Sequence, residues 1–101
     1  MSKIQYLGGY PDCSKRFTAL IKRINNDLVF YSYLISRKEQ FRISKNDILN
    51  IRYERGSLRT NIKNLIIIKI CYKNNGIEIL LNGGIFGEKE YSELMSLAYS
   101  N

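Results

Sequence analysis

The end of the chain decides the fold, and it contains Ile77-Glu-Ile-Leu-Leu-Asn82, then Gly83-Gly-Ile-Phe-Gly87, then a stretch from Glu88 to Tyr99. Residues 77–82 have the alternation of a strand, with Ile77, Ile79 and Leu81 directed to a core. The glycine-rich segment 83–87 predicts a tight turn. Residues from about 88 to 99 predict a single amphipathic helix, so the chain closes with a strand, a turn and a helix.

The helix prediction rests on one apolar stripe at positions i, i+3, i+4 and i+7: Tyr91, Leu94, Met95 and Ala98. Glu88 and Glu90 fall in the first turn, where carboxylates suit the positive end of the helix dipole. A helix this short is marginal in isolation. We therefore expect the stripe to pack against a sheet.

The rest of the chain has the pattern of strands, which we predict at 15–24, 28–35, 39–43, 48–54 and 63–73. Hairpin turns are expected at Asn25-Asn26-Asp27 and Asn74-Asn75-Gly76, and Ser44 with Asp47 favours a single capped helical turn. The strand over 63–73 is so apolar that an exposed edge on it would invite pairing. The fold class is mainly β with one C-terminal α-helix.

Length and composition indicate a single globular domain over residues 1–101, because 45% of residues are hydrophobic and 25% are charged. No apolar run approaches the roughly 20 residues of a membrane helix, and the N-terminus lacks a signal-peptide pattern, so we expect the cytoplasm. In that compartment Cys13 and Cys71 are expected to be reduced thiols.

The net charge of +7 is unevenly distributed. Residues 1–73 carry 15 of the 16 Lys and Arg and five of the nine acids, a balance of +10. Residues 74–101 carry one Lys and four acids, a balance of −3. A ligand bound through charge is therefore expected on the strands and loops, away from the helix.

Three segments carry a family resemblance: Tyr6-Leu-Gly-Gly-Tyr-Pro11, the hairpin at 26–30, and Phe41-Arg-Ile-Ser-Lys-Asn-Asp-Ile48. Together with the closing helix, the chain from Tyr6 to Tyr99 resembles the bacterial PH-like (GRAM-like) domains. The resemblance implies an antiparallel barrel or sandwich of six to seven strands capped by the helix. It also implies a module that binds lipids or proteins.

The chain departs from the phosphoinositide-binding PH domains at one point. Those domains carry basic residues on both strands of their first hairpin. Here Lys22 and Arg23 precede the predicted turn, but the next strand has no basic residue before Arg37. The resemblance therefore implies an incomplete phosphoinositide pocket.

The sequence argues against an enzyme, because the chain has no histidine, the commonest general base. Asp12 beside Cys13 has the wrong charge to activate a thiol, and the nine acids show no catalytic or cation-binding spacing. The glycines at 83–87 lack the lysine of a phosphate loop, and Glu88 and Glu90 would repel an anion there. We expect no catalytic residues, no cofactor and no metal.

Two candidate binding surfaces remain. The first is a partner patch of Val29, Tyr31 and Tyr33; alternatively, this second face of the strand is covered by the N-terminal segment or by the loop after Arg55. The second is a set of contacts for nucleic acid or anionic lipid: Lys22, Arg23, Arg37, Lys38, Arg55 and Arg59. Further phosphate contacts could come from Lys15, Arg16, Arg42 and Arg52.

These patterns favour a non-enzymatic binding module, acting on a protein partner or as a homo-oligomer. We expect an adaptor or inhibitor from a bacterium or phage. The alternative is an electrostatic binder of nucleic acid or of an anionic membrane surface.

Overall fold

A computed structural model describes residues 2–33, 38–54 and 65–99. The elements are β1 (Ser2–Gly8), β2 (Phe17–Ile24), β3 (Asp27–Ser32), β4 (Glu39–Ser44), a 3₁₀ turn (Lys45–Asp47), β5 (Ile48–Glu54), β6 (Ile66–Asn74), β7 (Ile77–Ile85) and α1 (Glu88–Tyr99). The helix has the bounds that the sequence predicts.

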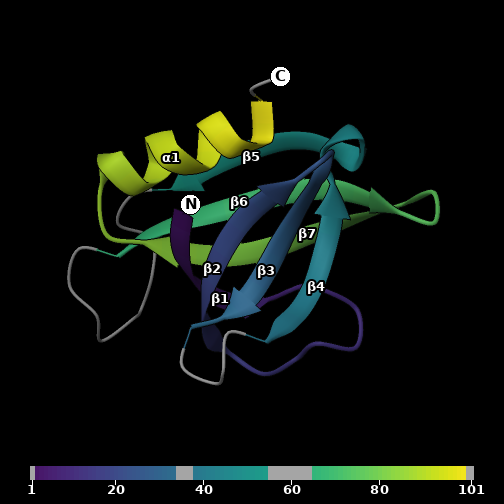
Figure 1. Cartoon of the computed structure of the whole chain (residues 1–101), viewed down its shortest axis with the longest axis horizontal. Coiled ribbons are helices and arrows are strands. Elements are labelled where there is room, and N and C mark those ends of the chain that lie inside the picture. The colour runs from purple at the N-terminus through teal and green to yellow at the C-terminus, as the bar shows by residue number, and fades with distance from the viewer. Residues whose placement is uncertain (1, 34–37, 55–64, 100–101) are drawn as a thin grey trace.

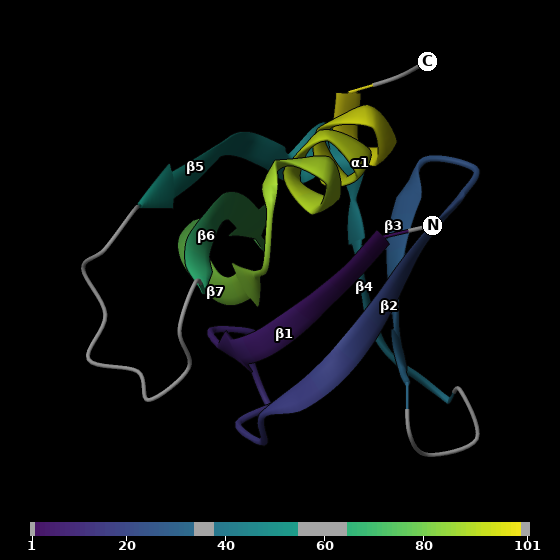
Figure 2. The same cartoon turned by 90° about the vertical axis from the view of Figure 1, so that its left-hand side faces the viewer.

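The seven strands form one antiparallel sheet in the order β4-β3-β2-β1-β7-β6-β5. The sheet is strongly curved, and α1 lies over one end of it, packed against β1 and β2 (Figures 1 and 2). A seven-stranded antiparallel sheet followed by one C-terminal helix is consistent with a PH-like architecture. The predicted fold class is therefore confirmed.

One continuous core joins both halves of the sheet to the helix. It includes Ile4 and Ile21 from one half, and Ile68 and Leu81 from the other. The helix stripe is confirmed: Leu94 and Ala98 are buried, and Tyr91 and Met95 are half-buried against the core. The helix thus gains its stability from the sheet, as its short length requires.

The strand β1 is missing from the sequence prediction. Its pattern is short, because Ile4 and Tyr6 are the large side chains that give it a buried face. In the sheet β1 is nevertheless central, since it pairs with β2 on one side and β7 on the other. Its long-range pairing partners, and not its local sequence, make it a strand.

The prediction that residues 83–87 form a turn is wrong for its first three residues, because β7 continues to Ile85. Gly83 lies opposite Tyr6 and Gly84 opposite Gln5 in the ladder with β1. A Cβ atom on Gly84 would lie 2.8 Å from the Leu65 side chain. The glycine therefore permits close packing inside the sheet, and the turn shrinks to Phe86 and Gly87.

The ends of β7 and β6 correct two further expectations. Ile77 was expected in the core, but it sits at the hairpin tip and is 68% exposed. The apolar strand predicted at 63–73 is β6, which lies between β7 and β5 and so has no free edge; residues 63 and 64 lie outside the described residues. The edges of the sheet are β4 and β5.

The two predicted hairpin turns and the predicted capped turn are confirmed. Asn25 and Asn75 have φ angles of 56° and 53°, in the left-handed region that hairpin turns of this kind require. The Ser44 side chain caps the 3₁₀ turn by accepting a hydrogen bond of 3.3 Å from the Asn46 N–H.

Candidate functional site

The connection between β1 and β2 is fixed to the core by aromatic side chains. The buried Tyr6 hydroxyl donates to the Cys13 carbonyl and accepts a hydrogen bond of 2.9 Å from the Tyr10 N–H. The Tyr10 ring stacks on the Phe41 ring, with 4.1 Å between centroids. Burial raises the pKa of Tyr6, so its hydroxyl stays protonated and remains a donor. The loop therefore holds a defined position.

The packing of the loop explains the second glycine of Tyr6-Leu-Gly-Gly-Tyr-Pro11. Gly9 has a φ of 109°, and a Cβ atom there would overlap the Leu80 carbonyl of β7. The Gly9 carbonyl also accepts from the Tyr72 hydroxyl at 3.4 Å. Glycine is needed because the loop crosses close above a neighbouring strand.

A pocket of about 290 Å³ opens beside this loop. We call it the basic pocket; its lining residues are Cys13, Lys15, Arg16, Phe17, Thr18, Ser32 and Gln40. They come from the β1–β2 connection, the start of β2, the end of β3 and the start of β4. Among these described residues two are cationic and none is acidic, and Phe17 adds an apolar surface. Most of its lining surface is apolar, and Lys15 and Arg16 are its two cationic lining residues.

Of the predicted anion contacts that the structure describes, Lys15 and Arg16 line this pocket, whereas Lys22, Arg23 and Lys38 are not among its lining residues. Lys22 and Arg23 are consecutive on β2 and point to opposite faces; Lys22 is exposed, and Arg23 donates to the Asn25 carbonyl at 3.0 Å. Lys38 is exposed just before β4. Arg37, Arg55 and Arg59 lie outside the described residues.

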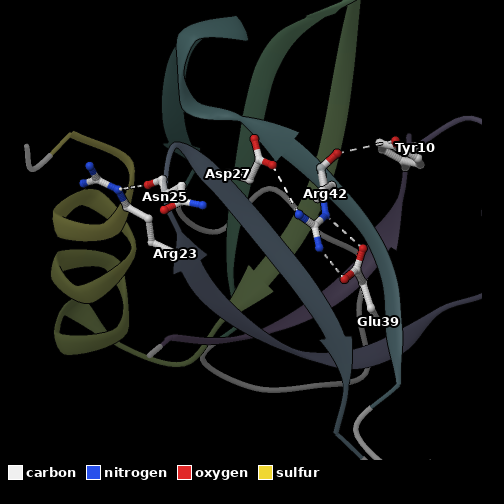
Figure 3. Close-up of polar contacts among 6 residues, drawn as sticks. All are labelled: Tyr10, Arg23, Asn25, Asp27, Glu39 and Arg42. Carbon is white, nitrogen blue, oxygen red and sulfur yellow. Dashed lines mark hydrogen bonds and ion pairs between the residues drawn. The ribbon is translucent and has the colours of Figure 1, made fainter.

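Arg42, another predicted phosphate contact, is engaged by acids of its own chain (Figure 3). Its guanidinium lies 2.6 Å from Glu39 and 3.3 Å from Asp27. The hydrogen bonds from Arg42 lower the pKa of the Glu39 carboxyl, and the same contacts raise the pKa of Arg42. The charge of Arg42 is thus already compensated.

Only part of the predicted partner patch is exposed to solvent. Val29 is fully buried, which corrects its assignment to the patch: its cross-strand neighbours Lys22 and Arg42 stand on either side of it. Tyr31 is half-buried, and Tyr33, just after β3, is 42% exposed. The expected binding surface therefore narrows to the two tyrosines.

Each of these tyrosine rings lies beneath a lysine. The Lys3 Nζ atom is 4.5 Å from the centroid of the Tyr33 ring, and the Lys22 Nζ atom is 5.8 Å from that of Tyr31. Both separations lie within the range of cation–π contacts. Lys3 belongs to β1, which lies beside β2 in the same sheet, so its side chain reaches Tyr33 along this face and leaves the ring 42% exposed.

The edge strand β5 is a third feature, which the sequence prediction missed. Leu49 and Tyr53 are exposed by 43% and 49%. The Tyr53 ring meets the Tyr91 ring of α1 edge to face, with 5.1 Å between centroids. The sequence shows Leu49 and Tyr53 two residues before and after Ile51. Whether their side chains are exposed depends on which strand lies at the edge of the sheet.

The described residues include no group of three or more His, Cys, Asp or Glu that could hold a metal ion. Cys13 and Cys71 are free and half-buried. In the same part of the chain, α1 is too short and too polar to cross a membrane.

Comparison with known protein families, with curated proteins and with solved structures finds no match for this chain.

Proposed function

We propose that the chain is a non-enzymatic binding module of the PH-like (GRAM-like) type that recognises a protein partner. The surface is the outer tyrosine face, which consists of Lys3, Lys22, Tyr31 and Tyr33. The observation that carries the proposal is the pair of lysine–tyrosine contacts at 4.5 and 5.8 Å on one outer face of the sheet.

This face has the chemistry of a protein interface. Tyrosine is enriched at such interfaces, since its ring offers a large contact area and its hydroxyl a polar group. The rings rest on a rigid base, because Leu20 and Val29, which are cross-strand neighbours of Tyr31 and Lys22, are buried. Two ammonium groups border the rings, so the matching partner surface carries carboxylates between apolar groups. An adaptor or inhibitor from a bacterium or phage would work in this way.

The basic pocket favours a second candidate function, the electrostatic one. Lys15 and Arg16 line a cavity of about 290 Å³ without an acidic side chain among its described lining residues. A phosphate group, from nucleic acid or from an anionic lipid, would satisfy both cations, and Phe17 would contact an apolar part of the ligand. Binding of this kind weakens steeply with salt.

Capture from a nuclease-treated native lysate, with mass spectrometry of the bound proteins, tests the leading proposal. We expect Tyr33→Ala to reduce capture of the partner at least about tenfold, the effect of losing a central interface aromatic. Tyr99→Ala is the matched control, because Tyr99 is 50% exposed but lies on α1. Equal capture by wild type and Tyr33→Ala, with both variants folded, would contradict the proposal.

Binding assays with oligonucleotides and with vesicles of anionic lipid, at low and at moderate salt, distinguish the electrostatic function from the leading proposal. If it holds, Lys15→Glu with Arg16→Glu abolishes binding, whereas Tyr33→Ala leaves it unchanged. If wild type binds neither probe at low salt, the electrostatic function is excluded.

A further inference from the structure

The chain contains the dipeptide Asn-Gly twice, at Asn75-Gly76 and at Asn82-Gly83. Such a dipeptide can react with itself, because the backbone nitrogen of the glycine can attack the side-chain carbonyl carbon of the asparagine and no glycine side chain obstructs the approach. The attack requires the peptide between the two residues to rotate. A dipeptide held in a β-ladder therefore reacts only after that part of the ladder has opened.

The first dipeptide, Asn75-Gly76, forms the tip of the β6–β7 hairpin. Asn74 and Ile77 are the last pair of the ladder, so the dipeptide lies outside both strands. Both of its residues are exposed, and the tip projects from the sheet (Figure 1). Around a Cβ atom placed on Gly76, no described atom beyond the chain neighbours would lie within 4 Å. Rotation of this peptide needs only local opening of the turn.

The second dipeptide, Asn82-Gly83, lies inside β7. Gly83 pairs with Ile68 of β6 on one side and with Tyr6 of β1 on the other. Gly83 is buried, and a Cβ atom on it would lie 3.0 Å from the Ile4 side chain. Rotation of this peptide requires β7 to separate from a neighbouring strand in the middle of the sheet. The same dipeptide is thus accessible at one site and held by the fold at the other.

The β2–β3 hairpin shows that the turn position alone does not make an asparagine reactive. Asn25 has a φ of 56°, close to the 53° of Asn75. The residue after it is Asn26, whose side chain obstructs the attack that a glycine permits. The Asn25 carbonyl also accepts from Arg23 at 3.0 Å, and the Asn26 carbonyl accepts from the Lys45 N–H at 2.7 Å. These bonds hold the Asn25–Asn26 peptide in place.

We propose that Asn75 is a site of spontaneous modification, which the folded chain converts to aspartate and isoaspartate. The Gly76 nitrogen loses its proton to a base and forms a bond with Cγ of Asn75, and the Cγ–Nδ2 bond breaks as ammonia leaves with a proton from water. Water then opens the cyclic succinimide at either of its carbonyl groups. No electrons are exchanged. The tip is not part of the outer tyrosine face, so this modification goes beyond the proposed function.

Both products change the hairpin tip. Each adds one negative charge to a chain whose net charge is +7. Isoaspartate also inserts the side-chain methylene carbon into the main chain, whereas a two-residue turn depends on backbone angles that match the twist of its strands. The isoaspartate form should therefore have a weaker β6–β7 hairpin than the aspartate form.

Incubation of the full chain at mildly alkaline pH, followed by peptide mapping with mass spectrometry, tests the site. Cleavage after Lys73 and Lys89 releases both dipeptides in one peptide, residues 74–89, and fragmentation locates the exchange of ammonia for water. We expect Asn75 to convert at least about tenfold faster than Asn82 in the folded protein. In urea the two sites should convert at similar rates. Asn75 converting no faster than Asn82 in the folded protein, or the same preference persisting in urea, would overturn the proposal.

The variant Asn75→Asp is the matched control for the effect on the hairpin. It carries the charge of the products on an ordinary main chain and has no amide to lose. An isoaspartate-specific methyltransferase identifies the isoaspartate fraction of the aged wild type, which we expect to unfold at a lower urea concentration than Asn75→Asp. Equal urea midpoints would overturn the claim that isoaspartate weakens the hairpin.

Discussion

The two edges of the sheet, β4 and β5, are built in different ways. On β4 the inward side chains Phe41 and Ile43 are buried, and the outward Arg42 is paired with Glu39 and with Asp27 of β3. On β5 Glu54 is likewise paired with Lys69 of β6, but Leu49 and Tyr53 are exposed. The two edges thus differ in their large apolar side chains, which are buried on β4 and partly exposed on β5.

The largest effect that separates the two edges should come from Phe41→Ala on β4. Phe41 is 5% exposed and its ring lies 4.5 Å from the Phe30 centroid and 4.1 Å from that of Tyr10. We expect a loss of about 3–5 kcal/mol in the free energy of unfolding, measured with urea. Tyr53→Ala on β5 should cost clearly less, because half of that side chain is already in water. Equal losses would mean that the β5 edge is as firmly packed as β4.

The next effect should come from Tyr6→Phe, which removes the hydroxyl that holds the β1–β2 connection near β4. The Cys13 carbonyl and the Tyr10 N–H both lose a partner. We expect a loss of about 1–3 kcal/mol, because partly buried polar groups are left unpaired. Urea unfolding measures it, and a neutral result would show that the hydroxyl does not anchor the loop.

Alkaline pH should lower the stability of the protein through two buried tyrosines. Burial raises the pKa values of Tyr6 and Tyr72 above the usual range of tyrosine, so both phenols are more easily ionised in the unfolded chain. Their contribution to stability is complete below pH 10 and is lost as the pH rises through the folded-state pKa values. Urea midpoints should therefore fall above about pH 10. Tyr72→Phe should make the fall of the urea midpoint with rising pH less steep. If the fall is unchanged, groups other than Tyr72 cause it.

The smallest effect should come from Arg42→Gln, which removes the charge that protects the β4 edge. The ion pairs are exposed, so stability at neutral pH should hardly change. Because Arg42 lowers the pKa of Glu39, the contribution of this pair to stability is present above the usual pKa of glutamate and is lost as the pH falls through the folded-state pKa. The variant should show a weaker acid dependence of its urea midpoint. If the Arg42→Gln variant also self-associates, the charge of Arg42 protects the β4 edge from pairing.

The sequence prediction succeeded where neighbouring residues decide the structure. The bounds of the helix, 88–99, follow from one apolar stripe and from acids in its first turn. The hairpin turns follow from Asn25 and Asn75, which tolerate positive φ angles. These features depend on interactions within a few residues, and the same is true of the six predicted strands that follow β1.

Only the tertiary structure decided which surfaces of those strands are available. Val29 is buried and Leu49 exposed because of the neighbours that each strand acquires, and Gly84 is a packing residue because Leu65 lies beside it. The basic pocket needs Arg16 and Gln40, which are brought together by folding. The local chain determined the elements by itself, whereas pairing between distant strands determined the edges, the pocket and the exposed tyrosines, because long-range contacts leave no periodic signal in the sequence.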